Sequence, residues 1–283
     1  MPELPEVETV VRGLRETILD KTITRVHVQA PPASIVVSRT LAPKTFASLL
    51  AGRKIQSITR RGKNILMHLS GELTLWVHLK MTGHFFYLPH THPVHKHDLV
   101  LIDFKSTKGG DNGCHLRFND YRRFGRLRLF PSDELDQQPG LAKLGPEPSE
   151  ITSDDFVKLC KRRPRMFKPA LLDQTFIAGL GNIYADESLY HARIHPRRMT
   201  NSPSPKKLIE LHGHIQRLLA KAIRLMGSSV DSYVGVNGSS GSFQKYLRAY
   251  NNEGRPCGRC GGRIVREKIG SRSAHYCPRC QRL

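Results

Sequence analysis

The sequence contains no run of 18 or more apolar residues, which excludes an ordinary membrane-spanning helix. It also lacks the basic and then apolar start of a secretory signal, because acidic residues stand early in MPELPEVETVVRGL. There is no internal repeat. These absences argue against a membrane protein and against export. They leave a chain of 283 residues, enough for about two domains at roughly 150 residues per domain.

Acidic residues are scarce as well. The chain has 24 Asp and Glu against 45 Lys and Arg, which gives a formal charge of +21. Such an excess favours a polyanionic partner, either nucleic acid or an anionic membrane surface. No single basic amphipathic helix concentrates the charge, so we favour nucleic acid. The simpler alternative is a basic protein whose charge only keeps it dispersed.

The first half of the chain is predicted to be one helix followed by a β-rich region. Apolar residues form a helical stripe at Val7, Val10, Val11, Leu14 and Ile18. From about residue 22 to 131, short β-rich runs alternate with turn residues, which favours a β-sandwich or barrel. The runs are TITRVHVQA, KIQSITR, NILMHLS, LTLWVHLKM, DLVLIDF, HLRFN and GRLRLF.

The second half is predicted to be mainly helical, so the expected fold class is α+β with two domains. Residues 132–150 are rich in Pro, Gly and acid and are interpreted as an interdomain linker. Ser153 is the expected N-cap of a helix over DDFVKLCKRR, and a longer helix covers LIELHGHIQRLLAKAIRLM. The Gly- and Ser-rich residues 227–242 are predicted to form a mobile loop.

Four cysteines form the most specific pattern in the sequence. Two CxxC pairs stand 16 residues apart at Cys257, Cys260, Cys277 and Cys280. Four thiolates in this pattern can enclose one tetrahedral Zn²⁺, which is structural because no coordination position stays open. The alternative is two disulfides, which a cytosolic setting disfavours. The residues between the pairs are predicted to form a basic β-hairpin that turns at Gly270 and suits a nucleic-acid backbone.

Pro2 offers a second kind of chemistry. Removal of Met1 would expose a secondary amine, and an α-amino group with a pKa of about 7.7–8.0 is partly unprotonated at neutral pH. Such an amine can attack an acetal-like sugar carbon and form an iminium, which is an electron sink for later eliminations. Glu3 beside it can supply or accept a proton. The simpler alternative is that Pro2 and Glu3 only begin a helix.

Five motifs occur in one order along the chain. They are PELPEVETV, HLKMTG, NDYRRFG, KPALLDQTFIAGLGNIYADE and the terminal cysteine hairpin. In this combination the chain resembles the formamidopyrimidine-DNA glycosylase family, the bacterial 8-oxoguanine glycosylases, nearly from end to end. The start PELPEV is more similar to that branch than to the related endonuclease VIII-like branch. The resemblance implies a catalytic β-sandwich domain over residues 1–131, a helix–two-turn–helix domain with a lesion-capping loop over 151–250, and a zinc finger over 251–283.

The resemblance also implies which residues carry the chemistry. Pro2 takes the role of the nucleophile, Glu3 that of the acid and base at the sugar, and Glu6 a supporting role beside it. Lys63, in RRGKN, and Arg272, in the zinc finger, match the catalytic set that holds the phosphates of the damaged nucleotide.

Further positions match DNA-binding residues of the family. Asn182 matches the phosphate-binding asparagine of the helix–two-turn–helix, and Lys168 matches a lysine associated with base recognition. A damaged base must leave the stack before an amine reaches its sugar, and Met81, Arg122 and Phe124 match the residues that fill the vacated space.

Two features depart from the family. Tyr121 stands where the family usually has proline before its two arginines, so the resemblance does not fix the angle of that loop. The four histidines between His90 and His97 match no family site. Four imidazoles in eight residues can bind a metal, but a solvated loop is the simpler interpretation.

We therefore expect a bifunctional DNA glycosylase and AP lyase of base-excision repair. It would remove 8-oxoguanine and formamidopyrimidines from duplex DNA by a Schiff base and β,δ-elimination. We expect one structural Zn²⁺, a monomer, no membrane partner, and a bacterial cytoplasmic location near the nucleoid through DNA binding. Two alternatives stay open: an endonuclease VIII-like enzyme for oxidised pyrimidines, and a non-catalytic zinc-dependent DNA-binding protein.

Overall fold

A computed structural model of the chain describes residues 1–29, 37, 41–105, 113–229 and 235–283. Most of the polar loop KSTKGGDNG and residues 230–234 of the predicted mobile loop lie outside the described residues. The chain forms two compact units. Unit 1 comprises Met1–Ala142 and Met226–Ser242, and unit 2 comprises Lys143–Leu225 and Phe243–Leu283.

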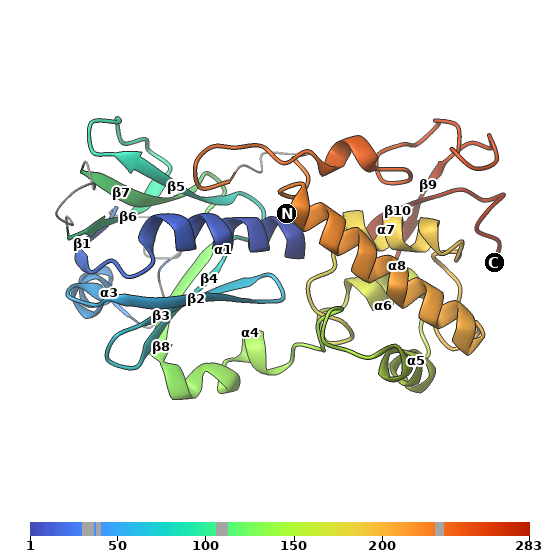
Figure 1. The fold of residues 1–283 in the computed structure, drawn as a ribbon, viewed down its shortest axis with the longest axis horizontal. Coiled ribbons are helices and arrows are strands. Elements are labelled where there is room, and N and C mark those ends of the chain that lie inside the picture. The colour runs from blue at the N-terminus through green and yellow to red at the C-terminus, as the bar shows by residue number, and fades with distance from the viewer. Residues whose placement is uncertain (30–36, 38–40, 106–112, 230–234) are drawn as a thin grey trace. The chain divides into compact units, whose positions relative to one another are not determined.

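Two antiparallel four-stranded sheets form the framework of unit 1, with strand orders β1-β6-β7-β5 and β2-β3-β4-β8 (Figure 1). This arrangement confirms the predicted sandwich, and β5 is a strand that the predicted runs did not include. The strands are β1 (Ile23–Val28), β2 (Ile55–Arg61), β3 (Asn64–Leu69), β4 (Leu73–His78), β5 (Gly83–Pro89), β6 (Asp98–Phe104), β7 (Cys114–Asp120) and β8 (Arg126–Pro131).

The helix α1 (Leu4–Ile18) supplies its apolar stripe to the core of unit 1. The five predicted stripe residues are all buried and share one core with side chains of both sheets. Burial of a Val, Leu or Ile side chain contributes about 1.5–3 kcal/mol. The stripe therefore fixes α1, and with it the two residues before Leu4, to the sandwich. A second helix, α3 (Pro43–Leu50), packs on β1 and buries Phe46.

The described part of residues 227–242 belongs to unit 1, whereas the sequence placed it in the helical domain. Val236 is 2% exposed and lies in the core of unit 1. Its carbonyl accepts a hydrogen bond from the Tyr87 N–H, and a Cβ on Gly13 of α1 would lie 3.2 Å from its side chain. The chain returns to unit 1 after its long helix because this apolar side chain is buried there.

Residues 132–150, predicted to be an interdomain linker, are folded and contain the border between the two units at Ala142 and Lys143. The short helices η1 (Ser132–Gln137) and α4 (Pro139–Ala142) belong to unit 1, where a Cβ on Gly140 would lie 2.7 Å from the Trp76 ring. Unit 2 begins at Lys143. The Gly145 N–H donates to the Gln174 carbonyl, and Glu147 is buried. The polar composition therefore reflects helix ends and turns with bound backbone groups.

Unit 2 is helical and ends in the predicted β-hairpin. Both α5 and α7 pack on α8, and α7 also packs on α6 and β10. In the described ranges, no helix is both long and apolar enough to cross a bilayer. The elements are α5 (Ser153–Arg162), α6 (Phe167–Leu172), α7 (Asn182–His191), α8 (Pro205–Arg224), η2 (Phe243–Tyr246), β9 (Val265–Ile269) and β10 (Arg272–Tyr276).

The N-cap of α5 is Thr152 rather than the predicted Ser153. The Thr152 hydroxyl accepts a hydrogen bond from the Asp155 N–H at 3.1 Å. Ser153 is the first helical residue, and its Oγ lies 3.1 Å from Nδ1 of His212 on α8. Both hydroxyls can in principle cap, and the packing of α5 on α8 selects between them.

Candidate active site

The start of the chain is buried in unit 1. Pro2 is buried, and Glu3 is 3% exposed. Glu6, in the first turn of α1, is 2% exposed, and its Oε2 accepts a hydrogen bond from the Glu3 N–H at 2.8 Å. A glutamate at this position of a helix commonly binds the backbone of the N-cap residue. The contact fixes the backbone that carries the predicted nucleophile and its acid.

The second oxygen of Glu6 reaches a distant part of the chain. Its Oε1 accepts a hydrogen bond from the Ser228 N–H at 2.8 Å. Gly227 has a φ of +77°, and a Cβ there would lie 2.7 Å from the same Oε1. Only glycine adopts this backbone at low cost in so small a space. Glu6 therefore joins the first residues of the chain to the base of the 227–242 segment, a contact that the sequence did not predict.

Lys63 lies among other cations. It is in the turn between β2 and β3 and is 5% exposed. Burial, and then the charges of Lys80, Lys63 and Arg126, lower the pKa of His78 to about 3. The three cations around this neutral imidazole create a local positive potential that suits phosphate groups. The sequence missed His78, Lys80 and Arg126. The only signal was their place at or near the ends of the predicted strands LTLWVHLKM and GRLRLF.

The side chains predicted to fill the space left by the damaged base are exposed on unit 1. Met81 is 41% exposed and Phe124 is 45% exposed, although both are large and apolar. The guanidinium carbon of Arg122 lies 4.8 Å from the centre of the Phe124 ring, a cation–π contact. Tyr121, at the position that departs from the family, is 55% exposed. Its ring meets that of His97 edge-on, with 6.3 Å between the centres.

One buried carboxylate, that of Asp120, organises this exposed group. Its Oδ1 accepts hydrogen bonds from the hydroxyl of Thr82, which follows Met81, and from the Arg122 N–H. Its Oδ2 accepts a hydrogen bond from the Gly125 N–H at 2.7 Å. Asp120 is fully buried, so these bonds are shielded from water. Asp120 therefore positions both segments, a role the sequence did not predict although the residue stands inside the quoted motif NDYRRFG.

One residue of the histidine-rich segment belongs to a group of possible metal ligands. His90, Asp103 and His115 place ligand atoms within 4.8 Å of one another. However, the fully buried Arg117 donates from Nε to Nε2 of His115, which puts the His115 proton on Nδ1, the atom that faces Asp103. A metal would have to displace that proton beside a buried guanidinium. The geometry thus favours the simpler interpretation of a loop held by Arg117.

In unit 2, Asn182 is the first residue of α7. Its Oδ1 is buried, and no hydrogen-bond partner for it exists among the described residues. Backbone N–H groups at a helix N-terminus attract anions, so this end of α7 is suited to a phosphate. The loop before it requires Gly179, whose φ is +94°. These features agree with the predicted phosphate contact of Asn182, which stays a prediction.

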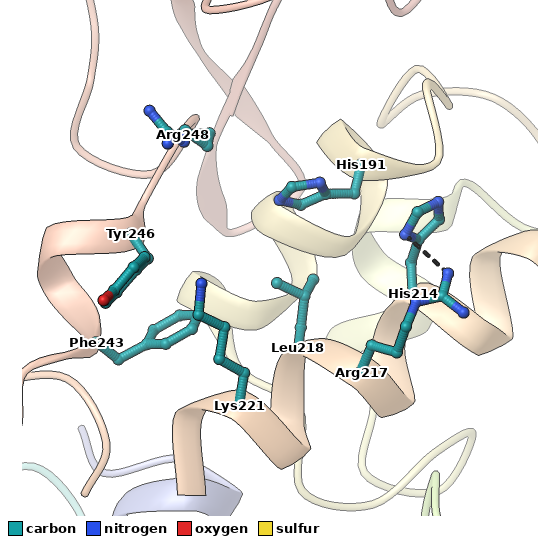
Figure 2. A pocket seen from close by; sticks show the side chains of 8 residues that line it. All are labelled: His191, His214, Arg217, Leu218, Lys221, Phe243, Tyr246 and Arg248. Atoms are coloured by element: carbon teal, nitrogen blue, oxygen red, sulfur yellow. Dashed lines mark hydrogen bonds between the residues drawn. The ribbon is translucent and has the colours of Figure 1, made fainter. Parts of the chain in front are cut away.

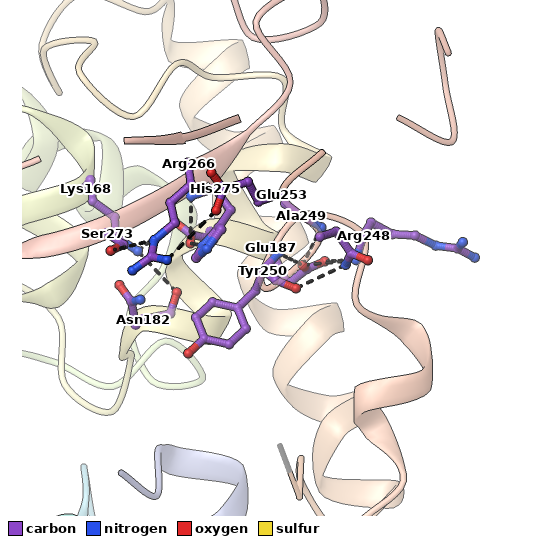
Figure 3. Close-up of polar contacts among 12 residues, drawn as sticks. Lys168, Asn182, Glu187, Arg248, Ala249, Tyr250, Glu253, Arg266, Ser273 and His275 are labelled. Carbon is purple, nitrogen blue, oxygen red and sulfur yellow. Dashed lines mark hydrogen bonds and ion pairs between the residues drawn. The ribbon is translucent and has the colours of Figure 1, made fainter. Parts of the chain in front are cut away.

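Lys168, predicted to take part in base recognition, lies in a buried ion pair. Its side chain is fully buried, and its Nζ binds Asp186 Oδ1 at 2.6 Å and the Asn182 carbonyl at 3.2 Å (Figure 3). Direct recognition of a DNA base would require this ammonium to leave a buried ion pair. These contacts position α7, and the association of Lys168 with base recognition stays a prediction.

The same helix also holds the hairpin. Asp186 Oδ2 accepts a hydrogen bond from the His275 N–H at 3.0 Å and lies 2.9 Å from His275 Nδ1. Glu187 accepts the backbone N–H groups of three consecutive residues, Arg248, Ala249 and Tyr250 (Figure 3). Arg272 is exposed at the start of β10, and these contacts fix the strand that carries it.

The four predicted metal ligands lie together at the end of unit 2. Their sulfur atoms lie within 4.8 Å of one another. Cys257 and Cys280 are separated by 3.9 Å and Cys260 and Cys277 by 3.5 Å, and all four cysteines are free thiols. A tetrahedral Zn²⁺ with Zn–S bonds of about 2.3 Å separates its sulfurs by about 3.8 Å. The donor set therefore fits one structural zinc, and the alternative of two disulfides is wrong.

Family models match nearly the whole chain. The model described as "Formamidopyrimidine-DNA glycosylase N-terminal domain" matches residues 1–127, and the "Formamidopyrimidine-DNA glycosylase H2TH domain" matches residues 144–234. The "Zinc finger found in FPG and IleRS" matches residues 254–283. Formamidopyrimidine-DNA glycosylases of Pelotomaculum thermopropionicum and Ligilactobacillus salivarius are each 44% identical over 285 residues, with 99–100% of both chains covered.

Solved structures of a Lactococcus lactis protein share the fold over its full length. A mutant Fpg in complex with Fapy-dG-containing DNA has a TM-score of 0.89 and 34% identity, with all of both chains covered. The same protein in complex with abasic-site DNA has a TM-score of 0.88 and 34% identity over 99% of this chain and 100% of that one. A wild-type complex with oxidised-pyrimidine DNA also has a TM-score of 0.88, at 34% identity with both chains fully covered.

Proposed function

Because the chain belongs to the formamidopyrimidine-DNA glycosylase family, we propose that Pro2 is the nucleophile with which it excises oxidised purines. The chain is a bifunctional base-excision-repair glycosylase and AP lyase that acts on duplex DNA. One observation carries the assignment of the site. The segment that begins PELPEV is buried in unit 1 and anchored by Glu6, and the same unit holds Lys63 in positive surroundings.

The proposed reaction begins after removal of Met1, since the printed chain holds the Pro2 nitrogen in a peptide bond. The amine attacks C1′ of the damaged nucleotide, the glycosidic bond breaks, and the base leaves with a proton. The C1′–O4′ bond then breaks, O4′ takes up a proton, and the opened sugar is linked to Pro2 as an iminium. Loss of a C2′ proton expels the 3′ phosphate, and a second elimination expels the 5′ phosphate, leaving a one-nucleotide gap. Water then hydrolyses the remaining iminium and frees the Pro2 amine. Glu3 gives and takes the protons at the sugar.

Residues of both units bind the DNA in this proposal. Lys63, Asn182 and Arg272 bind phosphates around the damaged nucleotide, which requires no particular sequence. Met81, Arg122 and Phe124 enter the space that the damaged base vacates. Their exposure supports this role, because apolar side chains of this size are usually buried.

The zinc site belongs to the same DNA-binding function. The ion is held by Cys257, Cys260, Cys277 and Cys280, and it supplies structure rather than a catalytic step. Tyr190 supports the site, since its hydroxyl lies 3.3 Å from the Cys257 sulfur. We further propose that the protein acts as a monomer in the bacterial cytoplasm near the nucleoid. We also propose that the functional regions are the sandwich over residues 1–131, the helical region over 151–250 and the zinc finger over 251–283.

Borohydride trapping on an abasic-site duplex tests the nucleophile. We expect the protein without Met1 to form a covalent adduct whose peptide map places the sugar on Pro2. The adduct should form more slowly in Pro2→Gly, which replaces the secondary amine by a primary one, and at the normal rate in Glu16→Gln, a variant of an exposed α1 residue. Unchanged trapping in Pro2→Gly, or an adduct on a lysine, refutes the proposal. The absence of any adduct favours the non-catalytic DNA-binding alternative.

A lesion panel separates the two enzymatic alternatives. Duplexes that contain 8-oxoguanine should be cleaved faster than duplexes that contain thymine glycol. The comparison is informative because a solved relative was complexed with oxidised-pyrimidine DNA as well as with Fapy-dG DNA. Faster cleavage at thymine glycol would favour the endonuclease VIII-like preference.

A further inference from the structure

A basic pocket of about 280 Å³ lies in unit 2, and none of the residues that line it is assigned above to catalysis, DNA binding or zinc (Figure 2). The end of α7 contributes His191, α8 contributes Arg217 and Lys221, and the segment after η2 contributes Arg248. Leu218 and Phe243 give the pocket an apolar part. Figure 2 shows the lining side chains on these three segments of the unit, with Arg217 directed toward His214.

The three cations of the pocket have no carboxylate partner among the described residues. The Lys221 ammonium lies 3.6 Å from the centre of the Tyr246 ring, and Arg217 lies 3.3 Å from His214 Nδ1. By contrast, Arg197 is paired with Glu267 and Lys207 with Glu210. Like charges gathered without acids repel one another, so the arrangement is stabilised when an anion joins it.

The histidines of the pocket show the same positive potential. Burial, and then His214, Arg259, Arg248 and Lys221, lower the pKa of His191 to about 4. His191 is therefore neutral at pH 7, and it offers a ring N–H as a donor without an added charge. A neutral donor among several cations is suited to the oxygen atoms of a phosphate.

We propose that this pocket is a second phosphate-binding site of unit 2. It is distinct from the Asn182 site, because Asn182 begins α7 and His191 ends it. Ten helical residues separate these ends by about 14 Å at 1.5 Å per residue. The ligand is a phosphate group, carried either by a DNA backbone beyond the damaged nucleotide or by a free compound such as a polyphosphate.

Inorganic pyrophosphate is the first probe. We expect titration of the zinc-loaded protein at low salt to shift the ring signals of His191 and His214 in NMR spectra. The double variant Lys221→Gln/Arg248→Gln should bind pyrophosphate at least tenfold more weakly. Lys206→Gln, which removes the same charge from an exposed position of α8, should stay within twofold. Lys221→Arg should retain binding, which shows that a loss reflects charge rather than misfolding.

The second arm identifies the source of the phosphate. The affinity for a long and for a short undamaged duplex is measured against salt concentration. If DNA is the source, the double variant should lower the salt slope by about one to two for the long duplex only, at about 0.9 per phosphate contact. An unchanged slope with weakened pyrophosphate binding assigns a free phosphate compound. The proposal is overturned if wild-type protein binds no pyrophosphate and the duplex slopes are also unchanged.

Discussion

The Glu6 carboxylate accepts a hydrogen bond from the backbone N–H of Ser228, 222 residues farther along the chain, at a distance of 2.8 Å. Its other oxygen holds the Glu3 N–H. The residues that begin the chain and the base of the proposed lesion-capping segment therefore share one buried anchor. A disturbance of either partner is transmitted to the other through this carboxylate.

Glu6→Gln should weaken this anchor while it keeps the size of the side chain. An amide has only one oxygen, so one of the two buried N–H groups loses its acceptor, at a cost of about 1–3 kcal/mol. We expect the free energy of unfolding to fall by that amount. Excision of 8-oxoguanine should fall more than strand cleavage at an abasic site, which has no base to cap. Glu16→Gln is the matched control, and equal excision by both variants would contradict the role of Glu6.

Asp120→Asn should loosen the exposed group that includes Arg122 and Phe124. The amide cannot accept all three hydrogen bonds of the carboxylate, so the turn at residues 121–125 loses its fixed conformation. We expect excision to fall at least tenfold, while the salt dependence of binding to undamaged duplex stays unchanged. Asp133→Asn, on an exposed residue, serves as the control. A lower salt slope in Asp120→Asn would indicate instead that phosphate contacts were lost.

Lys168→Met should destabilise unit 2 because it leaves the buried Asp186 carboxylate without its cation. Breaking a buried pair from one side costs about 3–5 kcal/mol, whereas replacing both partners is often nearly neutral. The double variant Lys168→Met/Asp186→Asn, whose neutral amide can still accept the His275 N–H, should therefore recover part of the lost unfolding free energy, as measured in urea. A Lys168→Met protein of normal stability with an altered lesion preference would favour the prediction of base recognition.

The pH dependence of stability should report His78. Its pKa is about 3 in the folded chain and about 6.5 when unfolded, so the unfolded chain binds more protons between these values. The contribution of His78 to the free energy of unfolding is therefore fully present above pH 6.5 and is lost as the pH falls below that value. Between pH 6.5 and 5, the free energy of unfolding measured in urea should fall by up to about 2 kcal/mol less in His78→Gln than in the wild type. Parallel pH profiles would show that His78 is protonated in the folded chain.

Removal of zinc should lower DNA affinity. Without the ion, the four thiols no longer hold the ends of the hairpin that carries Arg272, although Asp186 still binds His275. We expect chelation or Cys257→Ser to weaken duplex binding at least tenfold, and added zinc to restore the chelated protein. Cys114→Ser, at a cysteine of unit 1, should bind normally. Normal affinity with zinc measurably absent would count against a DNA-binding role for the finger.

The parts of the fold that were predictable are those fixed by local patterns. The stripe of α1 and the alternation of the β-rich runs follow from helix and strand periodicity, and the cysteine spacing follows from the geometry of a tetrahedral ion. The strand β5 was missed, and its sequence GHFFYLP begins with glycine and ends with proline. Glycine and proline at its two ends hid the strand pattern of this run, which is held as a strand by its pairing with β7.

The unpredicted features of the site depend on contacts between distant residues. Nothing near Glu6 in the sequence indicates Ser228, and nothing near Lys168 indicates that Asp186 neutralises it. Likewise, the motif NDYRRFG drew attention to its exposed arginine and phenylalanine, whereas the buried Asp120 holds them. Spacing shows which side chains share an element, but the partners of a buried charge are settled only by tertiary packing.

Unit 1 is assembled from two stretches of chain with all of Lys143–Leu225 between them, and Val236 completes its core. A ribosome adds roughly 5–20 residues per second, so Val236 is synthesised on the order of ten seconds after the first stretch of unit 1. A fragment that ends at residue 142 would lack Val236 and would leave the core of unit 1 unfilled beside Gly13 of α1. Unit 1 is therefore not a detachable module, because its folding is complete only after residues 226–242 have been synthesised.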